Sequence, residues 1–187
     1  MILETYQKQE LLKEKRYILF LGRVVAEKRV DLLLKATKDL GSIFPDLMLV
    51  IAGPVEDEKI VADYRDDKNI YFYGPVFGAE KDSLVQNCFI FSLPSDLEGF
   101  SVSLVEAMAK KCLCLSSDIK ANKEVTGDCG LYFKQGNLDD LECQIKNVYN
   151  DESQYISLKE AAYNRVKNNF TWDVLSERMI NFYKECK

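Results

Sequence analysis

Short apolar runs alternate along the chain with stretches whose apolar residues recur at helical spacing. The runs are almost unbroken, which is typical of strands buried on both faces of a parallel sheet. They cover residues 17–22, 47–52, 70–73, 88–93, 113–116 and 131–133. The helical stretches between them cover residues 30–41, 59–65, 80–87, 102–109 and 121–125. This order predicts an α/β fold, a single Rossmann-like domain with a parallel sheet of about six strands and helices on both faces.

The hydrophobic pattern also indicates where this core begins and ends. Residues 138–150, 152–169 and 172–184 show helical spacing, with Asn169 or Thr171 as the candidate cap of the last helix. Residues 1–16 are polar, carry charges of both signs and predict a linker or a surface helix. We therefore expect a Rossmann-like core over residues 17–150 and a helical C-terminal tail of the same domain over residues 151–187.

Composition narrows the class of protein. The 187 residues are 47% hydrophobic, enough for the core of one domain, and 25 basic against 30 acidic side chains argue against a nucleic-acid binder. No apolar stretch reaches the length of a transmembrane helix, and Glu4 follows Met1 too closely for a signal peptide. We therefore expect neither a transmembrane segment nor a nucleic-acid partner.

Cysteine and histidine usage limits the available chemistry. The six cysteines form no C-x-x-C pair and lie partly in apolar runs, which indicates reduced thiols in the cytoplasm. Because the chain has no histidine, it cannot build a Ser-His-Asp site, a Cys-His site or most zinc sites by itself. The acidic runs 56–58 and 66–67 are typical of solvated turns, so we expect no metal and no cofactor.

The most informative stretch follows the fourth predicted strand. Pro94 ends that strand, Glu98 lies in the next loop, and helical spacing resumes near Val102. The loop is at the carboxyl end of a parallel strand, where open α/β sheets bind their ligands. Gly99 lets a ligand approach the backbone closely, and the free N–H groups of residues 99–103 favour an anion.

Structural interpretations of the same residues remain open. Ser103-x-x-Glu106 matches a capping box, in which Glu106 would only secure the start of its own helix. Glu98-Gly99 also fits an ordinary turn. Two glutamates at this spacing fit, in addition, the carboxylate pair of a glycosidase, because the separation of the carboxyl groups cannot be derived from sequence.

The loop after the first predicted strand carries a second candidate site. Gly22-Arg23 is followed by Lys28, and two cations beside a helix start predict an anion site that suits a diphosphate. The alternative is a solvated basic turn in which Arg23 pairs with Glu27. Neither G-x-G-x-x-G nor G-x-x-x-x-G-K-[ST] occurs in the chain.

Four segments follow one another in a fixed order along the chain. They are Gly22-Arg23-x4-Lys28, the run 49–53, the run 71–76, and Pro94-Ser95-x2-Glu98-Gly99-Phe100-x5-Glu106-Ala107-Met108-Ala109. In this order they resemble the carboxyl-terminal, nucleotide-sugar-binding half of the retaining GT-B glycosyltransferases known as group 1 or family 4. The resemblance covers residues 17–150, and the helical tail is also as expected for that family.

The resemblance implies a role for each matching residue. Arg23 and Lys28 would neutralise the diphosphate leaving group, and Glu98 would contact the donor sugar, so these three are the expected catalytic residues. Glu106 would bind the ribose hydroxyls. The other expected substrate-binding positions are Gly22, Gly53, Val76, Gly99, Phe100, Ser101, Val102 and Ser103.

The chain also departs from the family pattern. Arg29 stands where the family usually has glycine, and we expect it either to crowd the phosphate loop or to add a third cation. Residues 109–113 replace an Ala-x-Gly-x-Pro segment, and residues 120–124 replace a Gly-x-x-Glu segment. We expect these two changes to alter the local backbone and not the donor site.

The resemblance implies a two-domain enzyme of which this chain holds the donor half. We expect a missing N-terminal acceptor domain, no useful transfer by this half alone, and packing of the last helix, with Trp172, partly on the other half. The implied reaction transfers sugar from a UDP- or GDP-sugar to a glycan or lipid-linked acceptor in cell-surface polysaccharide synthesis. The implied location is cytoplasmic, with peripheral membrane contact through the other half left open. The alternatives are a non-catalytic GT-B-like binding module, a nucleotide-sugar epimerase or a glycosidase.

Overall fold

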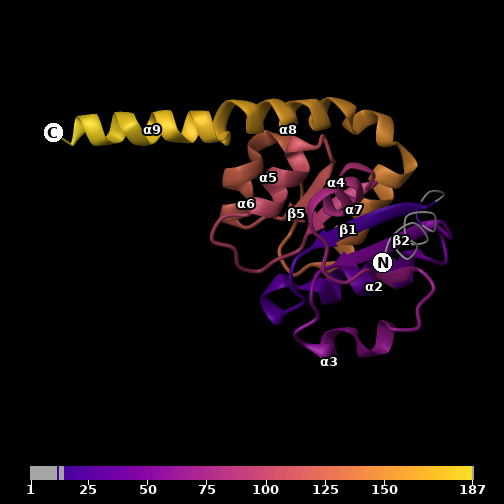
Figure 1. Ribbon diagram of the computed structural model, residues 1–187. Helices are drawn as coiled ribbons and strands as arrows, with labels where there is room; N and C mark the ends of the chain where they lie inside the picture. The colour runs from indigo at the N-terminus through magenta and orange to yellow at the C-terminus, as the bar shows by residue number, and fades with distance from the viewer. Residues whose placement is uncertain (1–11, 13–14, 187) are drawn as a thin grey trace.

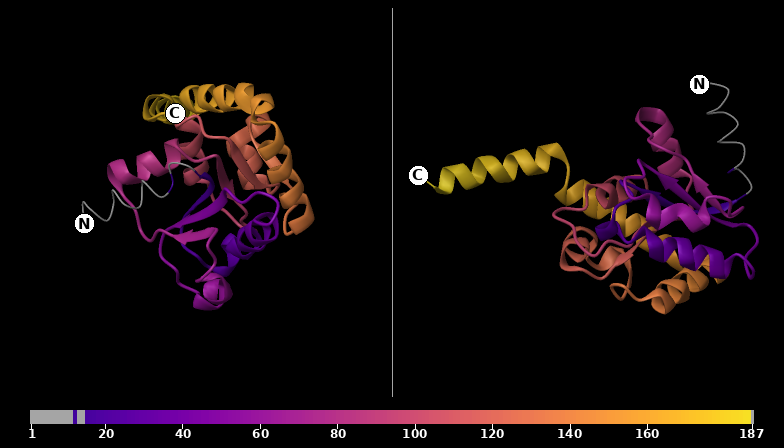
Figure 2. Two further views of the ribbon diagram at one scale, coloured as in Figure 1. Left: turned by 90° about the vertical axis from the view of Figure 1, so that its right-hand side faces the viewer. Right: turned by 90° about the horizontal axis from the view of Figure 1, so that it is seen from below.

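The computed structural model of the protein describes Leu12 and residues 15–186. The polar linker or helix expected over residues 1–16, and the residues that bear on a signal peptide, lie almost entirely outside this part of the chain. The fold prediction is confirmed, because one six-stranded parallel sheet with helices on both faces forms the body of the molecule (Figures 1 and 2).

The sheet is doubly wound. Its strands are β1 (Arg16–Leu21), β2 (Leu47–Ala52), β3 (Ile70–Phe72), β4 (Ile90–Leu93), β5 (Cys114–Ser117) and β6 (Leu131–Phe133). They lie in the order β3-β2-β1-β4-β5-β6, and every neighbouring pair is parallel. The order reverses between β1 and β4, so the loops after these two strands meet at a topological switch point, where open α/β sheets bind ligands.

The unbroken apolar runs explain the position of each strand. All six residues of β2 are buried, and β2 pairs along its full length with β1, which is also buried in its middle. Side chains that point to either face of these central strands meet helices, so the buried positions of both strands carry no charged side chain. Phe20, Phe91 and Phe133 are the largest fully buried side chains and place the core on both sides of β1, β4 and β6.

Helices cover both faces of the sheet (Figure 2). The helices are α2 (Val30–Leu40), α3 (Glu58–Val61), α4 (Gly78–Gln86), α5 (Val102–Ala109), α6 (Lys120–Thr126), α7 (Leu138–Asn150), α8 (Ile156–Asn169) and α9 (Trp172–Glu185). The 3-10 turns are η1 (Ala26–Lys28), η2 (Ala62–Tyr64), η3 (Gly127–Cys129) and η4 (Glu152–Tyr155). α2 packs against α7, and α5 packs against α6 and α8.

Local differences from the expected helices are small. The helix expected over 59–65 is divided into α3 and η2, and the helix expected over 152–169 begins with the 3-10 turn η4. The single turn expected over 121–125 extends to the seven residues of α6. Thr171 is the cap of α9, since its hydroxyl accepts a hydrogen bond from the Val174 amide at 3.4 Å.

The last helix leaves the body of the molecule. Figure 1 shows α9 projecting outward beyond the end of α8, and none of the 14 residues of α9 is buried. Its exposed apolar side chains include Trp172, whose relative exposure is 85%, together with Met179 and Phe182. The expected packing of α9 on another domain therefore stays a prediction.

Two findings bear on redox state and membranes. All six cysteines are free thiols. Among the helices formed by the described residues, none combines the length and apolar composition needed to cross a membrane.

Candidate functional site

The carboxyl ends of β1, β2 and β3 form a closely packed backbone ledge with a glycine near the end of each strand. A glycine follows β1 and β2 directly, and Gly74 lies two residues after the end of β3. The Gly22 amide donates to the Ala52 carbonyl at 3.0 Å, and the Gly53 amide donates to the Gly74 carbonyl at 2.9 Å. A Cβ at Gly53 would lie 2.0 Å from the Gly22 carbonyl oxygen, and its φ of 147° is one that other residues rarely adopt. Glycine at position 53 is therefore a requirement of the fold.

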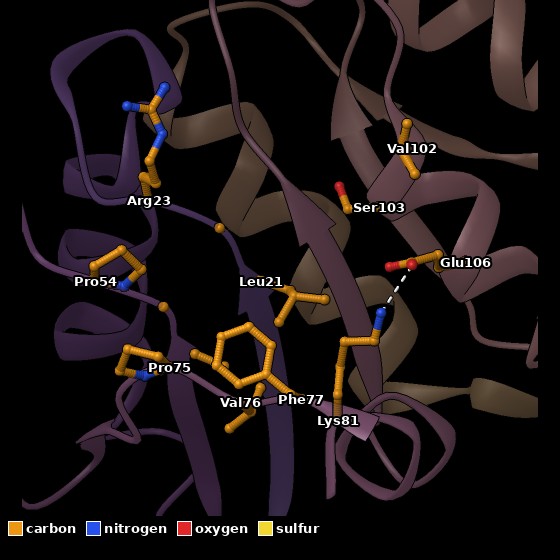
Figure 3. Close-up of a pocket in the computed structure, with 13 residues that line it drawn as sticks. Leu21, Arg23, Pro54, Pro75, Val76, Phe77, Lys81, Val102, Ser103 and Glu106 are labelled. Carbon is orange, nitrogen blue, oxygen red and sulfur yellow. Dashed lines mark hydrogen bonds and ion pairs between the residues drawn. The ribbon is translucent and has the colours of Figure 1, made fainter. Parts of the chain in front are cut away.

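An open pocket of about 390 Å³ lies between this ledge and the start of α5 (Figure 3). It is lined by Leu21, Gly22, Arg23, Ala52, Gly53, Pro54, Pro75, Val76, Phe77, Lys81, Val102, Ser103 and Glu106. Seven of these were expected from the sequence as substrate-binding or catalytic positions: Gly22, Arg23, Gly53, Val76, Val102, Ser103 and Glu106. The structure thus brings together residues from the loops after three strands and from α5.

Arg23 lies at one side of the pocket and is well exposed. Its guanidinium donates to the Glu56 carboxylate at 3.1 Å, and the two side chains are 58% and 45% exposed. The alternative in which Arg23 pairs with Glu27 is therefore wrong, because the partner of Arg23 is Glu56. An exposed pair of this kind contributes little to stability and can open when a ligand offers a better anion.

Lys28 and Glu98 lie outside the lining of this pocket and pair with each other. The Lys28 Nζ is 2.7 Å from Glu98 Oε1, and the Ser95 hydroxyl donates to the same oxygen at 2.7 Å. The Glu98 side chain is only 10% exposed. The two partners are 70 positions apart in the sequence, and they meet at the switch point between β1 and β4.

A buried chain of hydrogen bonds holds the loop that carries Glu98. The Ser101 hydroxyl donates to Asn122 Oδ1 at 2.7 Å, and the Asn122 amide donates to the Ser117 carbonyl and hydroxyl at 3.1 and 3.0 Å. The Ser117 hydroxyl donates in turn to the Ser95 carbonyl at 2.5 Å. The loop is therefore tied at both ends to the segment from β5 to α6, and the Ser101 hydroxyl is committed to the fold, which leaves only its backbone for a ligand.

Gly99 and Phe100 occupy the outer part of the same loop. A Cβ at Gly99 would meet no described atom within 4 Å, and its φ is not in the left-handed region. The fold therefore does not require glycine there. The Phe100 ring is 54% exposed and lies edge-on against the Phe170 ring, with 5.7 Å between centroids. The Val102 amide was expected to be free for an anion, but it donates to the Phe100 carbonyl at 2.9 Å.

Glu106 projects from α5 at the other side of the pocket from Arg23 in Figure 3. Its Oε1 lies 2.8 Å from the Lys81 Nζ at the start of α4. α5 begins at Val102, with Ser101 at the N-cap position and without a capping bond from that side chain, and Ser103 lies inside the helix. The capping-box interpretation of Ser103 and Glu106 is therefore wrong.

Arg29 connects two loops and is not a free third cation. Its guanidinium is 3.0 Å from a carboxylate oxygen of Asp31 and 3.0 Å from one of Asp96. Hydrogen bonds to these carboxylates, first that of Asp31 and then that of Asp96, raise the pKa of Arg29 above its ordinary value. The Asp96 amide also donates to the Glu27 carbonyl at 2.8 Å, so segments 27–29 and 96–98 are held side by side.

The described residues contain no group of three or more Cys, Asp or Glu side chains arranged to hold a metal ion. The expectation that the site needs no metal and no cofactor stays a prediction.

Comparison with known proteins identifies the family. The model of the family described as "Glycosyl transferases group 1" matches residues 3–165. The chain belongs to this family. Membership confirms the resemblance drawn from the four sequence segments, and it decides against the glycosidase and epimerase interpretations.

Relatives and solved structures agree with this assignment. A phosphatidyl-myo-inositol mannosyltransferase of Mycolicibacterium smegmatis is 28% identical over 177 aligned residues, and the match covers 92% of this chain and 46% of that protein. The capsular polysaccharide biosynthesis glycosyltransferase CapM of Staphylococcus aureus is 25% identical, over 96% of this chain and 48% of that protein. The Anabaena protein HepE in complex with UDP superposes with a TM-score of 0.83 at 15% identity, over 98% of this chain and 52% of that one. The chain thus spans about half the length of the relatives it matches.

Residues that were not expected from the sequence also lie in or under the site, among them Lys81, Phe77 and Asn122. Lys81 and Phe77 line the pocket, and Asn122 anchors the Glu98 loop. Phe77 is the N-cap residue of α4, the helix after β3, and Lys81 is the fourth residue of α4. The start of a helix that follows a parallel strand lies at the ligand-binding edge. That placement was the available signal for both, whereas nothing in the sequence connects Asn122 to Ser101.

Proposed function

We propose that this chain is the nucleotide-sugar-binding half of a retaining glycosyltransferase, which transfers a sugar from a UDP- or GDP-sugar to a glycan or lipid-linked acceptor. The observation that carries the proposal is the meeting of Lys28 and Glu98 at the switch point of the sheet, 2.7 Å apart. A shielded cation and carboxylate at this place suit a ligand with a diphosphate and a sugar joined to it.

The pocket would hold the nucleoside part of the donor. Arg23 would bind the diphosphate, Glu106 would accept hydrogen bonds from the ribose hydroxyls, and the loops at Gly53-Pro54 and Pro75-Val76 would flank the base. A pocket of about 390 Å³ is in the range for such a ligand. Structures of HepE with UDP and with UDP-glucose share this fold, which supports a nucleotide-sugar as the ligand class.

The loop after β4 would receive the donor sugar. Glu98 Oε1 already accepts from Lys28 and Ser95, so the carboxylate is oriented before a sugar binds. Gly99 supports the same role. The fold leaves room for a Cβ at this position, so packing does not explain the glycine, whereas close approach of a ligand to the backbone does.

Catalysis would rest on stabilising the diphosphate that departs. As the bond between sugar and phosphate breaks, negative charge grows on the diphosphate, and the ammonium of Lys28 and the guanidinium of Arg23 would stabilise it. Both side chains follow β1, so the sheet positions them before the reaction. No metal is needed to supply this positive charge.

The rest of the enzyme is also part of the proposal. The other substrate and the groups that exclude water would come from an amino-terminal domain, against which the exposed apolar side chains of α9 would partly pack. The names of the relatives favour cell-surface polysaccharide synthesis, in the cytoplasm or at the inner face of the membrane through that other domain.

Calorimetry on the purified chain tests the proposal. UDP or GDP should bind, and uridine and guanosine should bind at least about tenfold more weakly, because charge-assisted bonds to the diphosphate carry much of the affinity. Affinity should be the same with EDTA. Equal binding of nucleosides and nucleoside diphosphates, or binding of neither, would contradict the proposal.

Two glutamine variants separate the roles of the glutamates. Glu98→Gln should weaken binding of a UDP- or GDP-sugar relative to that of UDP or GDP, because its proposed partner is the sugar. Glu106→Gln should weaken both by about tenfold, because its partner is the ribose that all these ligands share. The same response of both variants to every ligand would defeat this division of the site.

A further inference from the structure

Two ion pairs join α4 to α5, and they differ in position. Lys81 on α4 pairs with Glu106 on α5 at 2.8 Å, with side chains that are 27% and 40% exposed. Lys110, at the end of α5, pairs with Asp82 on α4 at 3.2 Å, with side chains that are 36% and 52% exposed. Only Lys81 and Glu106 line the pocket (Figure 3).

We infer that Lys81 is a positioning residue for the nucleotide, which holds the Glu106 carboxylate in the orientation that receives the ribose hydroxyls. This inference rests on the proposed function, in which Glu106 binds ribose. Lys81 engages Oε1, and the carboxylate points into the pocket in Figure 3. A carboxylate held by one strong hydrogen bond keeps its second oxygen in a constant position. Binding of the ribose then restricts less side-chain motion, which lowers the entropic cost of binding.

Charge gives Lys81 a second effect on the same ligand. A glutamate without a neighbouring cation would repel the diphosphate that the pocket is proposed to bind, and Lys81 offsets that repulsion. With Lys81 present, the charged side chains that line the pocket are Arg23, Lys81 and Glu106, with a net charge of +1 from two cations and one carboxylate. If Lys81 were absent, the charges of Arg23 and Glu106 would sum to zero.

The place of Lys81 on its helix has no evident structural benefit. It lies in the first turn of α4, near the positive end of the helix dipole, where a lysine is unfavourable. Residues that break a local rule of stability are concentrated at functional sites. The pair of Lys110 with Asp82 also connects the two helices, and its residues do not line the pocket, so its removal is a control for the loss of an ion pair between α4 and α5.

The test compares ribose recognition with and without Lys81. Calorimetry would measure UDP and GDP, each beside its 2′,3′-dideoxy analogue, for the wild-type chain, Lys81→Met, Lys81→Arg and the control Lys110→Met. Wild type should prefer the ribose form by about tenfold, as expected for hydrogen bonds to a charged group. Lys81→Met should lose most of this preference, Lys81→Arg should keep most of it, and Lys110→Met should behave as wild type.

Each outcome bears on a different step. A wild type that binds neither UDP nor GDP would overturn the proposed function and this inference together. A wild type that binds one of them with the expected preference, beside a Lys81→Met variant that keeps the preference in full, would overturn the inference alone. Loss of the preference in Lys110→Met as well would show that any weakening between α4 and α5 suffices, and would also overturn it. Thermal unfolding of each variant establishes that the folded chain is being measured.

Discussion

The two sides of the candidate site are built in different ways. Beside β1, β2 and β3 the shape comes from backbone contacts, with Gly53 against the Gly22 carbonyl, while the charges of Arg23 and Glu56 extend into solvent. Beside β4 and β5 the shape comes from buried side chains, with Asn122 at the centre, and the Glu98 carboxylate is shielded. The side beside β1, β2 and β3 therefore combines a rigid backbone with charges that can move. The side beside β4 and β5 combines a loop held by hydrogen bonds with a charge fixed in place.

This difference teaches where stability and ligand binding can be separated. On the ledge, exposed charges contribute little to folding because water screens them, so they are free to respond to a diphosphate. In the Glu98 loop, the Ser101 hydroxyl and the Ser95 carbonyl rely on buried partners, and a lost partner costs stability because the remaining group is left unsatisfied. Changes to backbone or buried residues should therefore affect the fold, and changes to the ledge charges should affect the ligand.

The largest expected effect is that of Gly53→Ala. Its Cβ would lie 2.0 Å from the Gly22 carbonyl oxygen at a φ of 147°, so the change combines a backbone clash with an unfavourable conformation. We expect the free energy of unfolding to fall by about 4 kcal/mol, measured by urea denaturation. Gly99→Ala is the matched control on the other side, and its unfolding free energy should stay within about 0.5 kcal/mol of wild type.

These two variants test directly whether the ledge and the Glu98 loop differ in how tightly they are packed. Similar losses for Gly53→Ala and Gly99→Ala would show that the outer loop is as tightly packed as the ledge. Gly99→Ala should still weaken binding of a UDP- or GDP-sugar, because its methyl group would occupy the space where the sugar is proposed to lie. Unchanged affinity for the sugar would remove Gly99 from the site.

The next effect is that of Asn122→Ala, which removes the centre of the buried hydrogen-bond chain. The Ser101 hydroxyl and the Ser117 carbonyl would lose their Asn122 partners inside the fold. We expect the free energy of unfolding to fall by about 2 to 3 kcal/mol. The control is Asn164→Ala on the exposed side of α8, which should change it by less than about 0.5 kcal/mol. Equal stability of the two variants in urea would show that the loop does not depend on this chain of bonds.

The third effect is on the ligand rather than the fold. Arg23→Ala should weaken UDP or GDP binding about tenfold or more, because a charge-assisted bond to the diphosphate is lost. Its unfolding free energy should stay within about 0.5 kcal/mol, since the pair with Glu56 is exposed. Calorimetry and urea denaturation on the same sample check both parts. Undiminished affinity would remove Arg23 from the diphosphate site.

Sequence predicted the fold well, for a physical reason. Strands buried on both faces need unbroken apolar runs, and each of the six expected runs overlaps a strand whose ends differ from the prediction by at most two residues. The candidate residues after β1, β2 and β4 then follow from the rule that ligands bind at the carboxyl edge of such a sheet.

Side-chain partners were beyond the sequence because they depend on loops that are distant along the chain. The alternative to a diphosphate site paired Arg23 with its neighbour Glu27, but folding brings Glu56 beside Arg23 across 33 positions. Glu106 matched a capping box by spacing, yet its partner is Lys81 on another helix. Arg29 was expected to add a free cation or to crowd the phosphate loop, but it forms ion pairs with Asp31 and Asp96, which come from two different segments.

The smallest expected effect is that of Glu56→Gln, and it has the opposite sign for the ligand. If Arg23 is an adaptable charge, a diphosphate must draw it away from Glu56, which is 3.1 Å away. Removing the negative charge of Glu56 should then strengthen UDP or GDP binding about two- to threefold, the size expected when an exposed ion pair no longer competes.

The matched control for this variant is Glu58→Gln. It breaks the exposed pair of Glu58 with Arg65 at 2.7 Å, on the same segment, and Arg65, unlike Arg23, lies outside the pocket lining. Both variants should unfold within about 0.5 kcal/mol of wild type, and only Glu56→Gln should bind the nucleotide more tightly. Weaker binding by Glu56→Gln in calorimetry would mean that Glu56 orients Arg23 for the diphosphate. The ledge would then be preorganised by a charge pair, as the Glu98 loop is, and the contrast between the two sides of the site would disappear.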